Sequence, residues 1–182
     1  RLGASALMQG LADGYFVLPY TIGDYLADDI RTGPIATDAP EFEAAEASVR
    51  SQIDAFMNNK GTKTVDYFHR KLGKIIWNKC GMSRNEKQLK EAMKEVKALR
   101  EEFYKDVFIP GTANSFNEPL AKSLRVADFL ELGELFAKDA LERTESCGGH
   151  FREESQSQEG EALRDDANFT FVSAWEYKGE PS

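Results

Sequence analysis

A helical repeat of apolar residues near the middle of the chain constrains its fold more than any other feature of the sequence. Leu89, Met93, Val96, Leu99 and Phe103 recur at spacings of four, three, three and four. This period predicts an amphipathic α-helix that opens at Ser83 or Asn85. The lysines and glutamates between these positions indicate a solvated face, so the helix needs neighbours that cover its other side.

Three further segments have the same kind of pattern. One begins at 37–41 and ends at 58–61, and another runs from Val65 to Cys80, with Gly81 closing it. A third spans Leu120 to Arg143, where Gly133 marks a place for a close neighbour. The residues expected to face the core are Phe42, Val49, Ile53, Phe56, Val65, Phe68, Leu72, Ile75, Ile76, Trp77, Leu124, Ala127, Leu130 or Glu131, Leu135 and Leu141. We therefore predict a mainly α fold, an antiparallel bundle of three or four helices.

The two ends of the chain differ from this bundle. Leu7 and Leu11 open a helix that we expect to reach Asp28 or Ile30, with a kink or break at Pro19. After Thr144 the sequence is rich in Gly, Ser and Glu, which indicates an irregular C-terminal tail. Within that tail, residues 169–172 have β propensity and predict a short β-strand that needs a partner.

Composition limits the classes of function. The net charge of −8 over 182 residues argues against nucleic acid as a partner. The apolar run that ends at Leu18 is too short for a membrane span, and Asp13 interrupts any signal peptide. We expect a cytoplasmic location, or one on the cytoplasmic face of a membrane. Cys80 and Cys147 fit no metal-binding spacing, and we expect both to be free thiols, Cys80 in the core.

The first residues could meet an anionic group. Arg1 offers a planar guanidinium suited to a carboxylate, and small residues follow it into a helix. The first turn of a helix has unpaired N–H groups and a partial positive charge. On its own this pattern more often reflects packing and a solvated terminus.

Three motifs, taken in order, resemble one family. They are Arg1-Leu2-Gly3-Ala4-Ser5-x-Leu7 followed by Gly10 and Gly14, then Arg143-Thr144-Glu145-Ser146-x-Gly148-x-His150, then Arg164-Asp165-Asp166 with Asn168-Phe169. The chain resembles the flavoprotein subunit of succinate dehydrogenase and fumarate reductase, from the end of its FAD-binding domain onward. It departs from the family pattern at Ser5-Ala6, where Asn-Ser is usual, at Cys147 in place of arginine, and at Phe169 in place of a common tryptophan.

The resemblance implies a role for several residues. Arg1 would bind a carboxylate of the dicarboxylate substrate, and Ala6 and Leu7 would contact the flavin through the backbone. Glu145 and His150 would support the flavin site from behind through structural hydrogen bonds. The resemblance implies no catalytic residue and no metal site in this chain, because the family's proton-donating arginine and flavin-binding glycines belong upstream.

The resemblance also implies a division of the chain and a set of partners. Residues 1–33 would be the last helix of the FAD-binding domain and a linker, residues 34–146 the helical bundle, and residues 147–182 a loop and short strand that pack back on the flavin domain. The whole subunit would interconvert succinate and fumarate by hydride transfer with FAD. Electrons would pass to or from an iron–sulfur subunit, a membrane cytochrome subunit and quinone. We expect this chain alone to be inactive and not to retain FAD.

Two other functions remain open on the sequence. An L-aspartate oxidase-like flavoenzyme shares the arginine–leucine start, the Glu145 to His150 motif and the bundle. A non-catalytic helical module that docks on a partner subunit is the second. Of the two histidines, His69 has no partner motif and is expected to be structural or exposed, and catalysis by Cys147 beside His150 is disfavoured against an ordinary loop cysteine.

Overall fold

The structure is a computed structural model that describes the backbone of residues 3–179 and the side chains of residues 6–179. Its contacts divide the chain into two compact units, residues 1–51 and residues 52–182. Each unit is described by itself below. Helix α3, Pro40–Asn58, begins in the first unit and ends in the second.

The first unit opens on one helical run in three parts. These are α1, Gly3–Ala12; a π-helical segment η1, Asp13–Val17; and α2, Leu18–Tyr25. The break expected at Pro19 is instead this wider π turn, and the helical run continues past the proline. Proline removes one backbone N–H and crowds the carbonyl four residues earlier, and a π segment accommodates that loss. The run ends at Tyr25, earlier than the expected Asp28 or Ile30, and turns follow.

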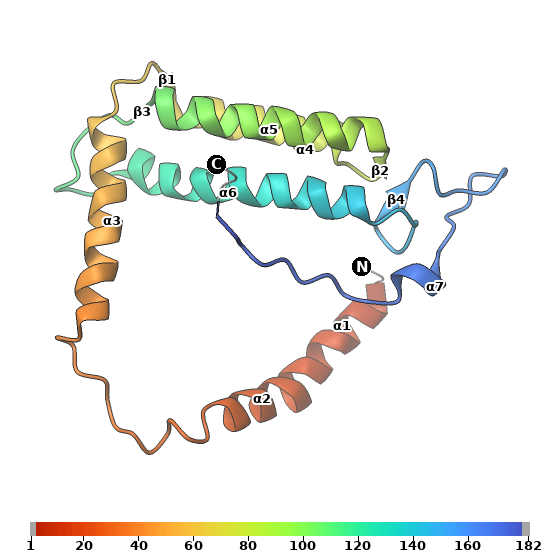
Figure 1. The fold of residues 1–182 in the computed structure, drawn as a ribbon, viewed down its shortest axis with the longest axis horizontal. Coiled ribbons are helices and arrows are strands. Elements are labelled where there is room, and N and C mark those ends of the chain that lie inside the picture. Colours follow the sequence, from red (N-terminus) through yellow and green to blue (C-terminus); the bar gives the residue numbers. More distant parts are fainter. Residues whose placement is uncertain (1–2, 180–182) are drawn as a thin grey trace. The chain divides into compact units, whose positions relative to one another are not determined.

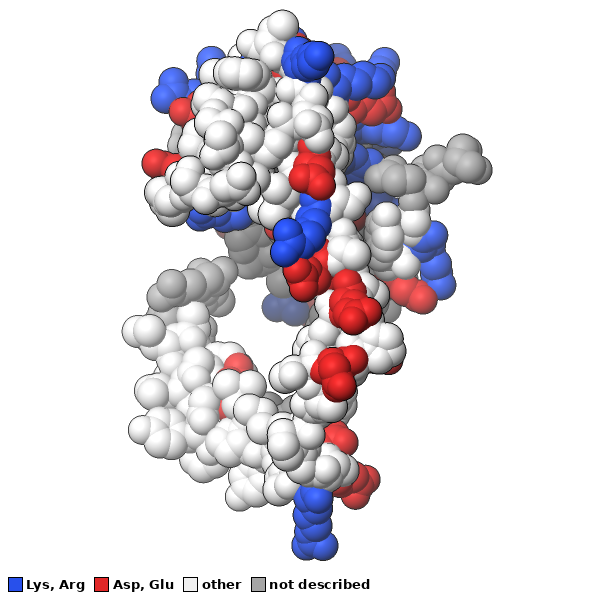
Figure 2. Space-filling model, turned by 90° about the vertical axis from the view of Figure 1, so that its left-hand side faces the viewer, with Lys and Arg blue, Asp and Glu red and all other residues white. Residues whose placement is uncertain are grey.

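The surface of this helical run is apolar. None of the described side chains of residues 6–25 is fully buried, and the only charged residues between positions 3 and 25 are Asp13 and Asp24. Acidic residues gather instead on α3, whose first turn contains Glu41 and Glu43. Figure 2 shows this contrast between acidic side chains along α3 and the largely white surface of α1–α2. An apolar surface of this extent is typical of an interface.

The second unit is a bundle of three long helices, α4 (Val65–Lys79), α5 (Glu86–Asp106) and α6 (Glu118–Glu142). Short connections make α5 antiparallel to both neighbours, and the three lie side by side (Figure 1). The side chains of Thr64, Asn85 and Asn117 cap the helix N-termini by accepting a backbone N–H three residues on. The predicted antiparallel bundle is confirmed.

The core of the bundle follows a heptad-like period. Apart from Leu120 in the first turn of α6, the buried positions of the three helices advance in alternating steps of three and four residues, which is the spacing of knobs-into-holes packing. They are Val65, Phe68, Leu72 and Ile75 on α4; Leu89, Ala92, Val96, Leu99 and Phe103 on α5; and Ser123, Val126, Leu130, Gly133, Ala137 and Ala140 on α6. On α6 the predicted stripe is displaced, because Leu124, Ala127 and Leu141 are only partly buried beside this seam.

At Gly133 the three helices of the bundle come close together. A Cβ at this position would lie 3.2 Å from Leu72 Cδ1 and 3.6 Å from Ile76 Cδ1. The predicted close neighbour of Gly133 is therefore confirmed. The buried position of Cys80 is confirmed as well, but the prediction of Trp77 as a core residue is wrong, since its side chain is 84% exposed. The same prediction is wrong for Phe42 and Val49 on α3, which are each 51% exposed.

The end of α3 closes one end of the bundle, so the core consists of three helices and the last turn of a fourth. Phe56 is buried, and its ring centroid lies 5.5 Å from that of Phe103 and 6.0 Å from that of Tyr104. Such aromatic pairs contribute about 1 kcal/mol beyond their buried area. Of the three or four helices predicted, three therefore run the full length of the bundle.

Two short parallel ladders tie the helix ends together. Strand β1, Lys63–Thr64, pairs with β3, Val107–Phe108, at one end of the bundle. At the other end, β2, Ser83–Arg84, pairs with β4, Phe151–Arg152 (Figure 1). The second ladder connects the start of α5 to the segment that follows α6.

The C-terminal tail contains a short strand, but not where the sequence predicted it. The strand is β4, whereas the predicted strand at 169–172 is wrong: a one-turn helix α7, Asp166–Phe169, and irregular backbone occupy that stretch. Asp165 caps α7, accepting from Asn168 N at 3.3 Å and from Asn168 Nδ2 at 2.8 Å. Local capping therefore outweighs the β propensity of the sequence that follows.

Candidate functional site

The segment just after α6, residues 143–152, concentrates the buried polar side chains of the bundle. Among the described residues the buried polar or charged side chains are Ser123, Glu145, Ser146 and Arg152, and three of these lie in this segment. Buried polar groups need hydrogen-bond partners. The partners they find define the geometry of the candidate site.

Arg152 caps the C-terminus of α6. Its Nη1 donates to the carbonyl oxygens of Ala140 and Leu141, both at 3.0 Å, and to that of Arg143 at 3.3 Å. The last carbonyls of a helix have no intrahelical partner and carry a partial negative charge, so a cation is stabilising there. Nε of Arg152 also donates to Glu154 Oε2 at 3.0 Å.

Glu145 connects α6 to the tail. Its carboxylate is 3% exposed, and Oε1 accepts from Arg143 Nη1 at 2.7 Å. Oε2 accepts from the backbone N–H of Asp165 at 2.9 Å. Both oxygens of this buried carboxylate therefore have a partner, which is what makes its burial tolerable.

Arg143 holds the tail in place from the other side. It donates through Nη1 to the carbonyl of Phe169 at 3.1 Å and through Nη2 to that of Phe171 at 2.9 Å. The guanidinium carbon lies 5.4 Å from the centroid of each of these two rings. The contact combines hydrogen bonds with cation–π attraction. Arg143 and Glu145 thus fix the chain on both sides of α7.

His150 bridges two elements with both ring nitrogens. Nδ1 lies 2.8 Å from Arg84 Nη1, and Nε2 lies 2.8 Å from the carbonyl oxygen of Arg143. An arginine only donates and a carbonyl only accepts, so the network assigns the proton to Nε2 of a neutral ring. Burial, together with the positive charge of Arg84, Arg152 and Arg143, lowers the pKa of His150.

The tight turn between residues 147 and 150 leaves Cys147 without a catalytic base. The backbone groups of Cys147 and His150 exchange hydrogen bonds of 2.8 and 3.0 Å. Both nitrogens of His150 are used by Arg84 and Arg143, so neither is left to take a proton from the thiol. This geometry agrees with the interpretation of Cys147 as a loop cysteine.

Two of the predicted site residues, Glu145 and His150, come together within the second unit. Glu145 and His150 meet through Arg143, one at its guanidinium and the other at its carbonyl. Ala6 and Leu7 lie near the start of α1 in the first unit, where Ala6 is half-buried and Leu7 is 65% exposed. Arg1 lies outside the described residues. The assignment of these five residues to a flavin site stays a prediction.

One residue of this network was missed by sequence reasoning. Arg84 lies 66 residues before its partner His150, on β2, and its Nε also donates to the carbonyl of Gly81 at 2.7 Å. The sequence around it showed only the start of a helix. Only the pairing of β2 with β4 brings Arg84 and His150 together.

The polar groups of this network are used to hold the chain. Every hydrogen bond named above joins two groups of the second unit, and all but the two backbone bonds between Cys147 and His150 involve a side chain. Within residues 3–179 no three His, Cys, Asp or Glu side chains are grouped so that they could hold a metal ion. In the same range no helix combines the length and apolarity that crossing a bilayer requires. The arrangement is that of a rigid support.

Comparison with known proteins identifies the family. Residues 69–182, which include most of the bundle and the polar network after α6, match the family described as fumarate reductase flavoprotein C-term. The chain belongs to this family. The match begins in α4 and covers all three motif residues Arg143, Glu145 and His150.

Curated relatives agree with this family. The chain is 27% identical over 169 residues to the fumarate reductase flavoprotein subunit of Escherichia coli, covering 93% of this chain and 26% of that protein. It is 28% identical over 132 residues to the subunit of Proteus vulgaris, covering 72% of this chain and 21% of that protein. The chain therefore spans about a fifth to a quarter of the length of these relatives.

Solved structures of the family have the same fold. An Escherichia coli quinol fumarate reductase superposes with a TM-score of 0.64 at 26% identity, covering 77% of this chain and 23% of that one. The Mycobacterium smegmatis Sdh1 complex superposes with a TM-score of 0.56 at 28% identity, covering 70% and 21%. This chain is thus the flavoprotein C-terminal domain of an oxidoreductase family.

Proposed function

We propose that this chain is the C-terminal part of a flavoprotein subunit that interconverts succinate and fumarate with FAD. In this proposal residues 1–33 belong to the flavin-binding domain, residues 34–146 form the supporting bundle, and residues 147–182 pack back on the flavin domain. Electrons would pass to or from an iron–sulfur subunit and, through a membrane cytochrome subunit, quinone. The subunit would lie on the cytoplasmic face of the membrane through these partners.

The observation that carries this proposal is the apolar surface of α1, η1 and α2. Large apolar side chains of this run are about half exposed or more, and they are Leu7, Met8, Leu11, Tyr15, Phe16, Val17, Leu18, Tyr20, Ile22 and Tyr25. Such a surface calls for a large apolar partner. About three quarters to four fifths of the length of these relatives lies beyond the matched part, and we infer that this remainder covers the surface.

The start of α1 fits the approach of a planar ring. The first turn of this ten-residue helix has backbone N–H groups without intrahelical partners, and Ala6 in that turn carries only a methyl group. Backbone donors there would stabilise negative charge on a reduced flavin. FAD, when bound to the whole subunit, supplies the hydride acceptor or donor.

The residues of this chain would have positioning roles. Arg1 would fix one carboxylate of the substrate through two parallel hydrogen bonds. The start of α1 would hold the ring through the backbone at Ala6 and Leu7. Glu145 and His150 would keep residues 143–171 in the shape that supports the flavin site from behind. With its catalytic half elsewhere, this chain alone would neither turn over substrate nor retain FAD.

The experiment that tests the function is the substitution Arg1→Ala in the whole subunit. We expect fumarate reduction to fall by about a hundredfold, because one charge-assisted contact in the transition state is lost. The flavin absorbance of the variant is expected to stay unchanged. Arg31→Ala, an exposed residue of the same unit, is the matched control and should keep full activity.

Two outcomes would favour the other candidate functions. Normal fumarate reduction by the Arg1→Ala variant would point to a docking module without a substrate-binding role. Turnover of L-aspartate in place of succinate by the whole subunit would point to an aspartate oxidase-like enzyme. Either result would contradict the proposal directly.

A further inference from the structure

The outward face of α4 carries an exposed tryptophan in line with two cations. Arg70, Lys74 and Trp77 are spaced by four and three residues, so they lie on one face of the helix. All three are exposed, and the indole of Trp77 is 84% exposed. A tryptophan this exposed buries almost none of its large apolar surface within this chain. We call Arg70, Lys74 and Trp77 the α4 stripe.

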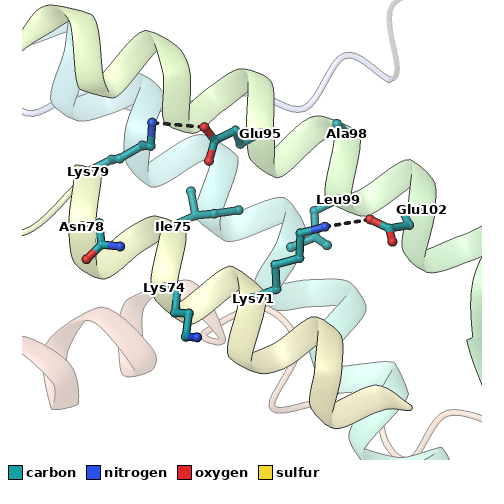
Figure 3. A pocket seen from close by; sticks show the side chains of 9 residues that line it. All are labelled: Lys71, Lys74, Ile75, Asn78, Lys79, Glu95, Ala98, Leu99 and Glu102. Carbon is teal, nitrogen blue, oxygen red and sulfur yellow. Dashed lines mark hydrogen bonds and ion pairs between the residues drawn. The ribbon is translucent and has the colours of Figure 1, made fainter. Parts of the chain in front are cut away.

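Neighbouring lysines on the other side of α4 are neutralised, whereas Lys74 is not. Figure 3 shows Lys71 reaching Glu102 and Lys79 reaching Glu95, over 3.0 and 3.1 Å. In the same view Lys74 extends away from α5. No ion pair joins Lys74 to any acidic side chain in the described part of the chain.

Arg70 is the second cation of the stripe without an ion pair among residues 3–179. The nearest acidic candidate on its own helix is Asp66, one turn earlier, and Asp66 is already paired with Lys122 on α6. Within residues 3–179 the stripe therefore has two cations without an ion pair, although Arg70 is near enough to Asp66 to help lower its pKa, on a chain whose net charge is −8. A positive site on an acidic protein favours an acidic partner.

The surface beside the indole is hollowed. Arg70, Gly73, Lys74, Trp77 and Asn78 line a shallow groove of about 460 Å³. A Cβ built at Gly73 would meet no atom within 4 Å, so the floor of the groove is open. The groove therefore has room for an aliphatic side chain lying against the indole.

We propose that the α4 stripe binds an acidic helix of a protein partner. The complementary helix carries two carboxylates four residues apart, facing Arg70 and Lys74, and an aliphatic side chain about one turn away that enters the groove beside Trp77. Tryptophan and arginine are the residue types most enriched among the residues that dominate binding at protein interfaces. This proposal is independent of the succinate–fumarate chemistry proposed above.

The charges of the stripe favour this partner over two others. Lipid recognition uses clusters of four to eight basic residues, and the stripe offers two cations. A second copy of this chain would bring together two molecules of net charge −8, which repel each other. An acidic helix needs only the two contacts that the stripe provides.

The test uses a defined probe. A synthetic alanine- and glutamine-rich helix of about 20 residues, long enough to hold helical structure, carries two glutamates four residues apart and a leucine three residues beyond. Binding is measured by fluorescence anisotropy of the labelled peptide. Its location is read from the ¹⁹F resonance of 5-fluorotryptophan at position 77, assigned by its loss in Trp77→Phe.

The expected result is saturable binding that shifts the Trp77 resonance and weakens as salt is added. The double substitution Arg70→Gln with Lys74→Gln should weaken binding about tenfold, the effect of losing two exposed ion pairs. A peptide with glutamine at both glutamate positions should bind the unaltered chain more weakly by the same factor. The matched control, Lys94→Gln with Lys97→Gln on the exposed face of α5, should bind as the unaltered chain does.

Four outcomes would overturn the proposal. The first is no saturable binding at about 1 mM peptide. The second is binding to phosphatidylserine vesicles, but not to the peptide, that depends on Arg70 and Lys74. The third is self-association of the chain that the Trp77→Ala substitution abolishes. The fourth is a ¹⁹F resonance at position 77 that is shielded from solvent in the whole flavoprotein subunit, because another part of the same subunit would then cover the α4 stripe.

Discussion

The Arg84 guanidinium donates from Nη1 to His150 Nδ1 across 2.8 Å, and this bond joins β2 to the residue just before β4, its partner in the ladder. It requires a histidine without a proton on Nδ1. The same ring donates from Nε2 to the carbonyl of Arg143. A proton added to Nδ1 would replace a hydrogen bond with the repulsion of two cations. The network is therefore stable only with neutral His150.

Stability of the chain is predicted to fall as the pH drops below about 6.5, the pKa of an unperturbed histidine. The folded state lowers the pKa of His150, so between the two pKa values the unfolded chain binds the extra proton. Protonation then favours unfolding, by at most about 1.4 kcal/mol per pH unit. The contribution is fully present above pH 6.5. Urea unfolding at pH 7.5 and 5.5 measures it.

The control for this prediction is His150→Gln, which does not titrate. Carboxylates that titrate at lower pH are the same in both proteins, so the difference between the two pH dependences isolates residue 150. We expect the natural chain to lose on the order of 1 kcal/mol more than the variant between pH 7.5 and 5.5. Equal losses in the two proteins would show that His150 is not held neutral by this network.

Arg152→Met is predicted to destabilise the bundle by about 3 kcal/mol. The substitution keeps much of the side-chain length but removes the donors to the carbonyls of Ala140, Leu141 and Arg143. Hydrogen bonds to charged groups contribute about 1.5–3 kcal/mol, and the buried carbonyls would lose their partner. Thermal and urea unfolding measure the loss.

The matched control for Arg152 is Arg164→Met. Arg164 pairs with Asp166 through side chains that are both more than half exposed, and such pairs contribute at most about 1 kcal/mol. If both variants unfolded at the same urea concentration, the capping of α6 by Arg152 would contribute nothing measurable to the stability of the bundle.

The two cysteines are predicted to react with a thiol reagent at very different rates. Cys147 is half-buried in the turn after α6, whereas Cys80 is 3% exposed and burial raises the pKa of its thiol. Only a thiolate reacts, and Cys80 is kept protonated and enclosed. We expect one equivalent of Ellman's reagent to react quickly with Cys147, and a second equivalent to react with Cys80 only when the chain unfolds. Cys147→Ser should abolish the fast phase, and a fast phase that persisted would contradict the burial of Cys80.

Hydrophobic period alone predicted the helices of the bundle, because each must bury one face. The start at residue 65, the cap at Asn85 and the end near Glu142 all follow from local signals. Trp77 was misassigned because an aromatic residue next to Ile76 fits an apolar stripe. In the folded bundle α4 buries Leu72 and Ile75 instead, and the indole of Trp77 faces outward.

Long-range pairing explains what the sequence could not predict. The motif from Arg143 to His150 was visible in the sequence, yet its partners lie on β2 and in the tail. Arg84 meets His150 only after α5 and α6 have folded against each other, and no local pattern encodes that contact. Residues 169–172 have the propensity of a strand, but Arg143 donates to two of the carbonyls in that stretch, those of Phe169 and Phe171. Tertiary hydrogen bonds thus override propensity there.

Gly61→Ala is predicted to destabilise the chain by about 3 kcal/mol, while Gly73→Ala stabilises it. A Cβ at Gly61 would lie 2.1 Å from the carbonyl carbon of Asp106 and 2.5 Å from the carbonyl oxygen of Val107. Those are backbone atoms, held by the parallel pairing of Lys63 with Val107, so relief of the clash must break the β1–β3 ladder. Gly73 faces open space inside a helix, where alanine is favoured by about 0.5–1 kcal/mol. Urea unfolding should give a lower free energy of unfolding for Gly61→Ala and a higher one for Gly73→Ala. An unchanged free energy of unfolding for Gly61→Ala would show that β1 and β3 do not pair in this register.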